Sequence, residues 1–173
     1  MAVAIKKLGY TNIKIYNGGL KDWMKSGNIT ESIEPLPEMQ VHFIDVNELM
    51  LALVEANERN CTDNDGSPLI TLIDFRVSQG RSQKKGADKY KIKTNCQTIS
   101  ATLDDFSNNS QLIQSLPQKG LIVSISETGN RDTFLIRYLS KFGINNIRGL
   151  KYGMRNWLKA NYPVERIEQT GTD

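Results

Sequence analysis

The fold of this chain is decided by one stretch of sequence, Leu121-Ile122-Val123-Ser124-Ile125-Ser126-Glu127-Thr128-Gly129-Asn130-Arg131. The apolar run at 121–125 predicts a buried strand of a parallel sheet. A polar six-residue loop follows at 126–131, and apolar side chains at near-helical spacing predict a helix over 132–142. Because a short loop between a strand and a helix N-terminus points backbone N–H groups at one spot, this loop predicts an anion or ligand cradle.

The rest of the chain alternates in the same way. The sequence predicts strands at 41–44, 68–74 and 97–100, a helix from Asp45 to about Ala56, and another helix within 109–116. Asp45 and Glu48 resemble a capping box at the start of the first helix. Residues 57–67 and 76–95 are polar and predict loops. Strands that alternate with helices indicate an α/β fold with an open parallel sheet flanked by helices.

An internal repeat indicates how the chain is divided into domains. Matching residues are 134 positions apart (143 − 9 = 134). The matching pairs are Gly9 with Gly143, Asn12 with Asn146, Gly19 with Gly153 and Trp23 with Trp157. Each copy predicts a helix end, a glycine stop, a short strand, a glycine loop and a helix that carries tryptophan. A whole domain precedes the second copy, whereas the first copy is expected to be the end of a domain whose body is missing from this sequence.

The repeat leads to four segments. Residues 1–27 are predicted to be the C-terminal remnant of a preceding domain, 28–40 a linker with Pro35 and Pro37, 41–166 a complete domain, and 167–173 a polar tail. The remnant carries apolar side chains from Ile5 to Met24. Because such a patch favours association, it is expected to dock on the complete unit or on a second copy of the chain in a homodimer.

Composition excludes several classes of function. The net charge is +3, from 22 basic and 19 acidic residues, and no basic stripe is interleaved with aromatic residues, so we expect no nucleic-acid partner. No apolar run is long enough to span a membrane, and the N-terminus lacks the order of a signal peptide, so a cytoplasmic location is the default expectation. The single histidine, His42, lies in an apolar run and is expected to be a strand residue, so we expect no metal site and no cofactor.

The two cysteines, Cys61 and Cys96, show neither metal-site nor redox spacing. They form no evident disulfide framework. Cys61 is expected to be an exposed thiol in a polar loop, and Cys96 a half-buried thiol before a short strand.

Three segments together resemble the rhodanese (thiosulfate sulfurtransferase-like) family in tandem-domain form. Leu72–Arg76 resembles the family's strand that ends in Asp-x-Arg, with Asp74 and Arg76 as supporting residues. Residues 122–131 resemble its active-site strand and loop, commonly Cys-Arg-x-Gly-x-Arg. Residues 143–164 resemble its closing strand, Gly-Gly loop and tryptophan helix. The resemblance implies a rhodanese-like domain over about 41–166 and a truncated copy over 1–27.

The loop departs from the family at its reactive position. Ser126 replaces the nucleophilic cysteine, and Glu127 stands where arginine is common. The family's chemistry needs a thiolate that holds sulfur as a persulfide, which a hydroxyl group cannot do, and the sequence positions no base to activate the serine. The family's Gly-His-Ile-x-Gly-Ala is also missing from 90–95.

The loop residues that remain predict at most a binding site, made of Ser126, Glu127, Thr128, Gly129, Asn130 and Arg131, with Ser126 as a vestigial nucleophile position. Gly129 and Arg131 are interpreted either as a surviving cradle, or as a turn residue and a partner of a carboxylate.

These departures leave the function open between two principal hypotheses. The first is a catalytically inactive rhodanese-like domain with a structural, regulatory or ligand- or partner-binding role beside a neighbouring rhodanese-like domain. The second is a part of a thiosulfate sulfurtransferase whose catalytic cysteine lies in a domain missing from this chain. A dual-specificity phosphatase ranks last, because it also needs a cysteine and a loop about one residue longer.

Overall fold

The computed structural model describes residues 9, 11–29, 35–76 and 90–167. The chain divides into two compact units, Met1–Pro35 and Leu36–Asp173, and each is described by itself. The expectations for residues 1–8, for most of the loop at 76–95 and for the tail after 167 lie outside the described residues.

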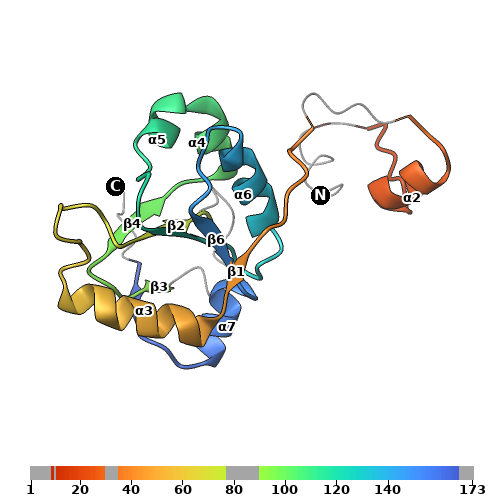
Figure 1. Cartoon of the computed structure of the whole chain (residues 1–173). Helices are drawn as coiled ribbons and strands as arrows, with labels where there is room; N and C mark the ends of the chain where they lie inside the picture. The colour runs from red at the N-terminus through yellow and green to blue at the C-terminus, as the bar shows by residue number, and fades with distance from the viewer. Residues whose placement is uncertain (1–8, 10, 30–34, 77–89, 168–173) are drawn as a thin grey trace. The chain divides into compact units, whose positions relative to one another are not determined.

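Five parallel strands form the sheet of the second unit, in the order β1-β6-β5-β2-β4 (Figure 1). They are β1 (Phe43–Ile44), β2 (Ile70–Asp74), β4 (Gln97–Ser100), β5 (Leu121–Ile125) and β6 (Ile147–Leu150). Strand β5 is central, because it pairs with β2 on one side and with β6 on the other. The loop after β5 therefore emerges at the middle of the sheet's carboxyl edge, where α/β sheets bind ligands.

Helices cover both faces of this sheet (Figure 1). Helices α3 (Val46–Glu58) and α7 (Gly153–Lys159) pack on one core, whereas α4 (Leu103–Asn108), α5 (Ser110–Gln114) and α6 (Asp132–Ser140) pack on the other. Successive β5 residues point into opposite cores: Val123 lies in the core with α3 and α7, and Ile122 lies in the core with α4, α5 and α6. Burial on both faces explains why β2 and β5 are nearly continuous apolar runs.

The predicted elements are confirmed with shifted bounds. Strands 97–100 and 121–125 are as predicted, but the strand at 41–44 shortens to Phe43–Ile44, which leaves His42 exposed just before β1. Asp45 caps α3 by accepting from the N–H of Asn47 rather than through a capping box. The capping box lies at Thr102 and Asp105, at the start of α4, which the sequence analysis missed.

A short antiparallel ribbon joins two segments that the sequence analysis kept apart. Strand β3 (Tyr90–Ile92) pairs with β7 (Val164–Arg166), with Ile92 opposite Val164. Strand β3 begins inside the stretch that polarity assigned to a loop. The ribbon ties the segment after residue 89 to the chain beyond α7.

The expectation of two free thiols is wrong. Cys61 and Cys96 form a disulfide with a Cα–Cα distance of 5.0 Å, and each residue is only 5% exposed. The side-chain oxygen of Asn57, near the end of α3, accepts from Asn95 N (3.0 Å) and Thr94 Oγ1 (3.1 Å). These bonds bring the segment before β4 against the end of α3. A contact between residues 35 positions apart is invisible to a search for cysteine spacing.

The sequence analysis expected no membrane-spanning segment and no metal site, and the described residues can be examined for both. Within the described ranges, no helix is both long and apolar enough to cross a membrane. Across the same ranges, no group of three or more metal-ligating side chains comes together.

The first unit contains one helix, α2 (Gly19–Lys25), within its described residues. Trp23 packs edge-on against Tyr16, with ring centroids 5.4 Å apart, and Tyr16 Oη donates to Asp22 Oδ2 at 2.8 Å. No residue of α2 is buried. Residues 11–16 have no regular secondary structure.

Residues 19–29, the α2 segment, and residues 153–163, the α7 segment, have the same local geometry. Each begins with a glycine of positive φ, 62° at Gly19 and 64° at Gly153, and each forms a helix of seven residues. In each, the tryptophan Nε1 donates to a carbonyl oxygen six residues later at 3.1 Å, from Trp23 to Ile29 and from Trp157 to Pro163. The glycine and tryptophan pairs of the sequence repeat, Gly19 with Gly153 and Trp23 with Trp157, therefore lie in segments of the same local geometry.

Candidate functional site

The polar loop at residues 126–131 connects the end of β5 to the start of α6, as the sequence predicts. Two backbone bonds hold it against the start of α7: Met154 N donates to Ser126 O at 2.9 Å, and Arg155 N donates to Glu127 O at 3.1 Å. A Cβ at Gly153 would lie 2.3 Å from Ser126 O. The glycine turn before α7 thus lets the loop and the helix approach each other closely.

Gly129 supports the same close contact from the loop side. Its φ is 84°, and a Cβ there would lie 2.8 Å from Tyr152 N. Tyr152 itself has φ 63°, which is uncommon for a residue with a side chain. Gly129 and Tyr152 both have positive φ, and their backbones lie in close contact. A side chain at position 129 would be unfavourable because of its backbone conformation and because of the lack of space.

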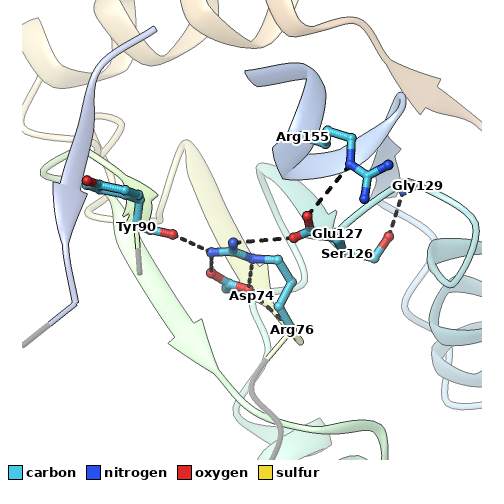
Figure 2. A network of polar contacts seen from close by, with 7 residues as sticks. All are labelled: Asp74, Arg76, Tyr90, Ser126, Glu127, Gly129 and Arg155. Carbon is cyan, nitrogen blue, oxygen red and sulfur yellow. Dashed lines mark hydrogen bonds and ion pairs between the residues drawn. The ribbon is translucent and has the colours of Figure 1, made fainter. Parts of the chain in front are cut away.

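Ser126 is buried, and its hydroxyl group is bonded both to its own loop and to the first residue of α6. Its residue is 1% exposed, its Oγ donates to Asp132 Oδ2 at 2.7 Å, and the same Oγ accepts from Gly129 N at 2.9 Å (Figure 2 shows the second bond). The expectation that no base lies near Ser126 is therefore wrong, because Asp132, the first residue of α6, is within hydrogen-bond distance. The hydroxyl closes the loop internally.

Asp132 is a buried carboxyl group with an incomplete set of partners. It is 0% exposed, and its Oδ1 has no hydrogen-bond partner among the described residues. Burial raises the pKa of Asp132 to about 6, and the hydrogen bond from Ser126 acts in the opposite direction. This carboxyl group, whose neutral form burial favours, lies 2.7 Å from Ser126 Oγ.

Asp74 and Arg76 form a rigid pair beside the loop (Figure 2). Arg76 Nε donates to Asp74 Oδ1 at 2.8 Å, and a terminal nitrogen donates to Asp74 Oδ2 and to the carbonyl oxygen of Tyr90, both at 2.6 Å. The side chains of Arg76 and Asp74 are only 4% and 6% exposed. A bidentate pair of this kind fixes the direction of the guanidinium group.

Glu127 extends this network across the mouth of the loop. Its Oε2 lies 3.9 Å from a terminal nitrogen of Arg76, and its Oε1 lies 3.9 Å from Arg155 Nε on α7 (Figure 2). The carboxylate therefore lies between two guanidinium groups, the arrangement that a bound anion would have. Arg155 and Tyr90 were missed by the sequence analysis, since neither belongs to the loop nor to the Asp-x-Arg segment.

The remaining loop residues face two different environments. Thr128, Gly129 and Asn130 line a hollow of about 500 Å³. Its other walls are Phe43, Asp45, Glu48, Lys151 and Tyr152. Arg131 is exposed, and its guanidinium carbon lies 5.5 Å from the centroid of the Phe75 ring. No carboxylate of the described residues pairs with Arg131, so its interpretation as the partner of a carboxylate is wrong, whereas the cradle interpretation stays a prediction.

Comparisons with known proteins point to fold alone. No family model matches the chain, and no curated protein does. Among solved structures, a rhodanese-related protein from Thermoplasma volcanium is 18% identical with a TM-score of 0.48, covering 72% of this chain and 97% of that one. A protein from Bacillus halodurans is 17% identical with a TM-score of 0.53, covering 86% and 85%.

A third structure, from Rhodopseudomonas palustris, is described as a protein of unknown function and possible tyrosine phosphatase. It is 13% identical with a TM-score of 0.51, covering 90% of this chain and 98% of that one. The likeness to the second and third structures is one of fold. At these identities it concerns the parallel sheet and its flanking helices alone.

Proposed function

We propose that the second unit is a rhodanese-like module that transfers no sulfur and has a structural, regulatory or binding role. The observation that carries this proposal is the hydroxyl group at position 126, where the family resemblance places a nucleophilic thiol. A serine hydroxyl has no comparable acidity and forms no persulfide. The two hydrogen bonds of its Oγ and its 1% exposure further separate it from any substrate.

Glu127 supports the same proposal through charge. Its carboxylate lies 3.9 Å from both Arg76 and Arg155, so it partly neutralises the two cations nearest the loop mouth. A thiosulfate dianion would have to displace this carboxylate or bind beside it. At 4 Å, two like charges repel by about 1 kcal/mol in water and by several-fold more in a less polar site.

The partner that we propose is a neighbouring rhodanese-like domain in a tandem arrangement. The support is the shared geometry of the α2 and α7 segments, including the tryptophan–carbonyl bond at 3.1 Å in both. In the α7 segment, Trp157 packs on a sheet and on α3; in the α2 segment, Trp23 is 39% exposed. A homodimer in which a second copy covers the α2 segment is the other outcome that this exposure allows.

The alternative is that this chain belongs to an active thiosulfate sulfurtransferase whose cysteine lies in another domain. The α2 segment supports a neighbouring domain equally well in either case. Both proposals predict that this chain is inactive, and they differ only in the residue that starts the neighbouring domain's loop. Phosphatase chemistry on this loop is disfavoured by the same Ser126.

The test is thiosulfate:cyanide sulfurtransferase activity in a series of variants. We expect no thiocyanate formation by the chain as it is, little for Ser126→Cys, and more for Ser126→Cys with Glu127→Arg, because the second change reverses a charge near a dianionic substrate. Arg155→Gln is the matched control, because it removes a cation from the network of Arg76, Glu127 and Arg155 without changing Ser126 or Glu127. Activity of the unaltered chain that survives the loss of Cys61 and Cys96 would refute the proposal, and full activity of the single Ser126→Cys variant would refute the role given to Glu127.

A further inference from the structure

Asp132 is a buried carboxyl group at the loop to which the proposed function gives no role. Its Oδ2 lies 2.7 Å from Ser126 Oγ, and the hydroxyl is the hydrogen-bond donor. A Cβ at Gly149 would lie 2.9 Å from the Asp132 Cβ, so the side chain is packed between β6 and the loop. Ser126 is thus held between a donor, Gly129 N, and an acceptor, Asp132.

The charged groups around this pair are committed elsewhere. Glu127 faces Arg76 and Arg155, Arg131 lies over the Phe75 ring, and Arg148 pairs with Glu48 at 3.3 Å. No cationic side chain of the described residues pairs with Asp132. The carboxylate is therefore not neutralised by a neighbour, and a group at position 126 meets its charge directly.

We propose that Asp132 is a positioning residue that keeps position 126 a protonated hydrogen-bond donor, so that a thiolate forms less readily there when cysteine is restored. This goes beyond the proposed function, which rests on Ser126 and Glu127. A serine fits between Gly129 N and Asp132 because its hydroxyl both accepts and donates. A thiolate can only accept, so the carboxylate would lose the donor at position 126 and two anions would be in contact.

Two effects on a cysteine at position 126 oppose each other. The N-terminus of α6 and the N–H of Gly129 favour a thiolate. Asp132 disfavours it, and its own pKa of about 6 means that the carboxyl group loses its proton first. The sulfur would then have to ionise beside an existing buried charge, and like charges in contact cannot both form freely. We assign the larger effect to the carboxylate, since it is buried and no cationic side chain of the described residues pairs with it.

The experiment measures the ionisation of the thiol itself in Ser126→Cys, Ser126→Cys/Asp132→Asn and Ser126→Cys/Glu127→Gln. The full chain with its disulfide intact is titrated, thiolate absorbance is followed in the ultraviolet, and the unaltered chain is subtracted to remove tyrosine ionisation. We expect a thiol pKa above the usual value of about 8.5 in the single variant. It should fall by roughly one to three units with Asp132→Asn, as for the removal of an adjacent like charge, and by less with Glu127→Gln.

Near-UV circular dichroism checks that each variant is folded, and Ser126→Cys/Asp132→Ser replaces the asparagine variant if that one is not. A thiol pKa at or below the usual value in Ser126→Cys would overturn the proposal. So would an equal fall with Asp132→Asn and Glu127→Gln. Because the readout is ionisation and not turnover, it is independent of whether any variant transfers sulfur, which is the test of the proposed function.

Discussion

Trp157 in the α7 segment is fully buried, whereas Trp23 at the matching place in the α2 segment is 39% exposed. The two segments nevertheless share the glycine of positive φ, the seven-residue helix and the tryptophan–carbonyl bond. The glycine turn and the helix are thus specified by bonds between residues a few positions apart. Burial is supplied by the sheet and α3, and the described residues of the first unit contain no counterpart of either.

The residues before each helix, in contrast, differ in structure although their sequences match. Ile147–Leu150 forms β6, with β1 on one side and β5 on the other. The matching residues 13–16 are also apolar and β-branched in part, yet they form no strand. A strand obtains its hydrogen bonds from other strands, so the same pattern gives a strand only where partners exist.

The largest expected difference between the two segments is the cost of removing each tryptophan. Trp157→Ala should lower the free energy of unfolding of the second unit by about 4 kcal/mol, as expected for a large core side chain. Trp23→Ala should change it by less than about 1 kcal/mol, since Trp23 is 39% exposed and belongs to no core cluster of the second unit. Urea unfolding followed by far-UV circular dichroism measures both, because this signal does not depend on the indole.

Equal costs for the two tryptophans would contradict the comparison. They would mean that Trp23 is buried in solution against a surface that the chain or a second copy provides. Light scattering on the Trp23→Ala variant and on the unaltered chain would then separate a homodimer from a monomer.

The glycines at the starts of the two helices give a smaller, better matched difference. Alanine at either position must adopt a left-handed conformation, which costs roughly 1–2 kcal/mol. At Gly19 a Cβ meets nothing within 4 Å, whereas at Gly153 it would lie 2.3 Å from Ser126 O and 2.7 Å from Gly129 N. Gly153→Ala should therefore cost at least about 2 kcal/mol more than Gly19→Ala in the same urea experiment.

The difference between these two glycine variants isolates the contact between the loop and the start of α7. If Gly153→Ala cost no more than Gly19→Ala, the loop would not be held against α7 in the way described. The candidate site would then lack the support on which its geometry depends.

Much of the second unit's fold could be predicted from its sequence because its strands are buried on both faces. Continuous apolar runs marked β2 and β5 almost to the residue. Strand β3 and helix α4 were missed, since Tyr90–Ile92 pairs with a segment more than 70 positions away and the Thr102–Asp105 capping box starts a helix of only six residues. Short elements carry too little periodicity to be read from sequence.

The candidate site shows the same difference between local patterns, which the sequence reveals, and long-range contacts, which it does not. Ser126, Glu127 and Gly129 were found because the loop is contiguous in sequence. The partners that determine their chemistry were not: Asp132 lies outside the loop, and Arg155 comes from α7. The spacing of six residues between Ser126 and Asp132, with Asp132 at the first turn of a helix, is a signal that a search for an activating base could have used. The Cys61–Cys96 disulfide depends on a long-range contact that no local pattern announces.

The most direct test of the central claim is the intact mass of the unaltered chain after incubation with thiosulfate. A sulfurtransferase stores the donated sulfur on its nucleophile, so an active loop would gain the mass of one sulfur atom. The account predicts no gain, because Ser126 cannot hold a persulfide and Cys61 and Cys96 are joined to each other. A sulfur adduct that cyanide removes would contradict it.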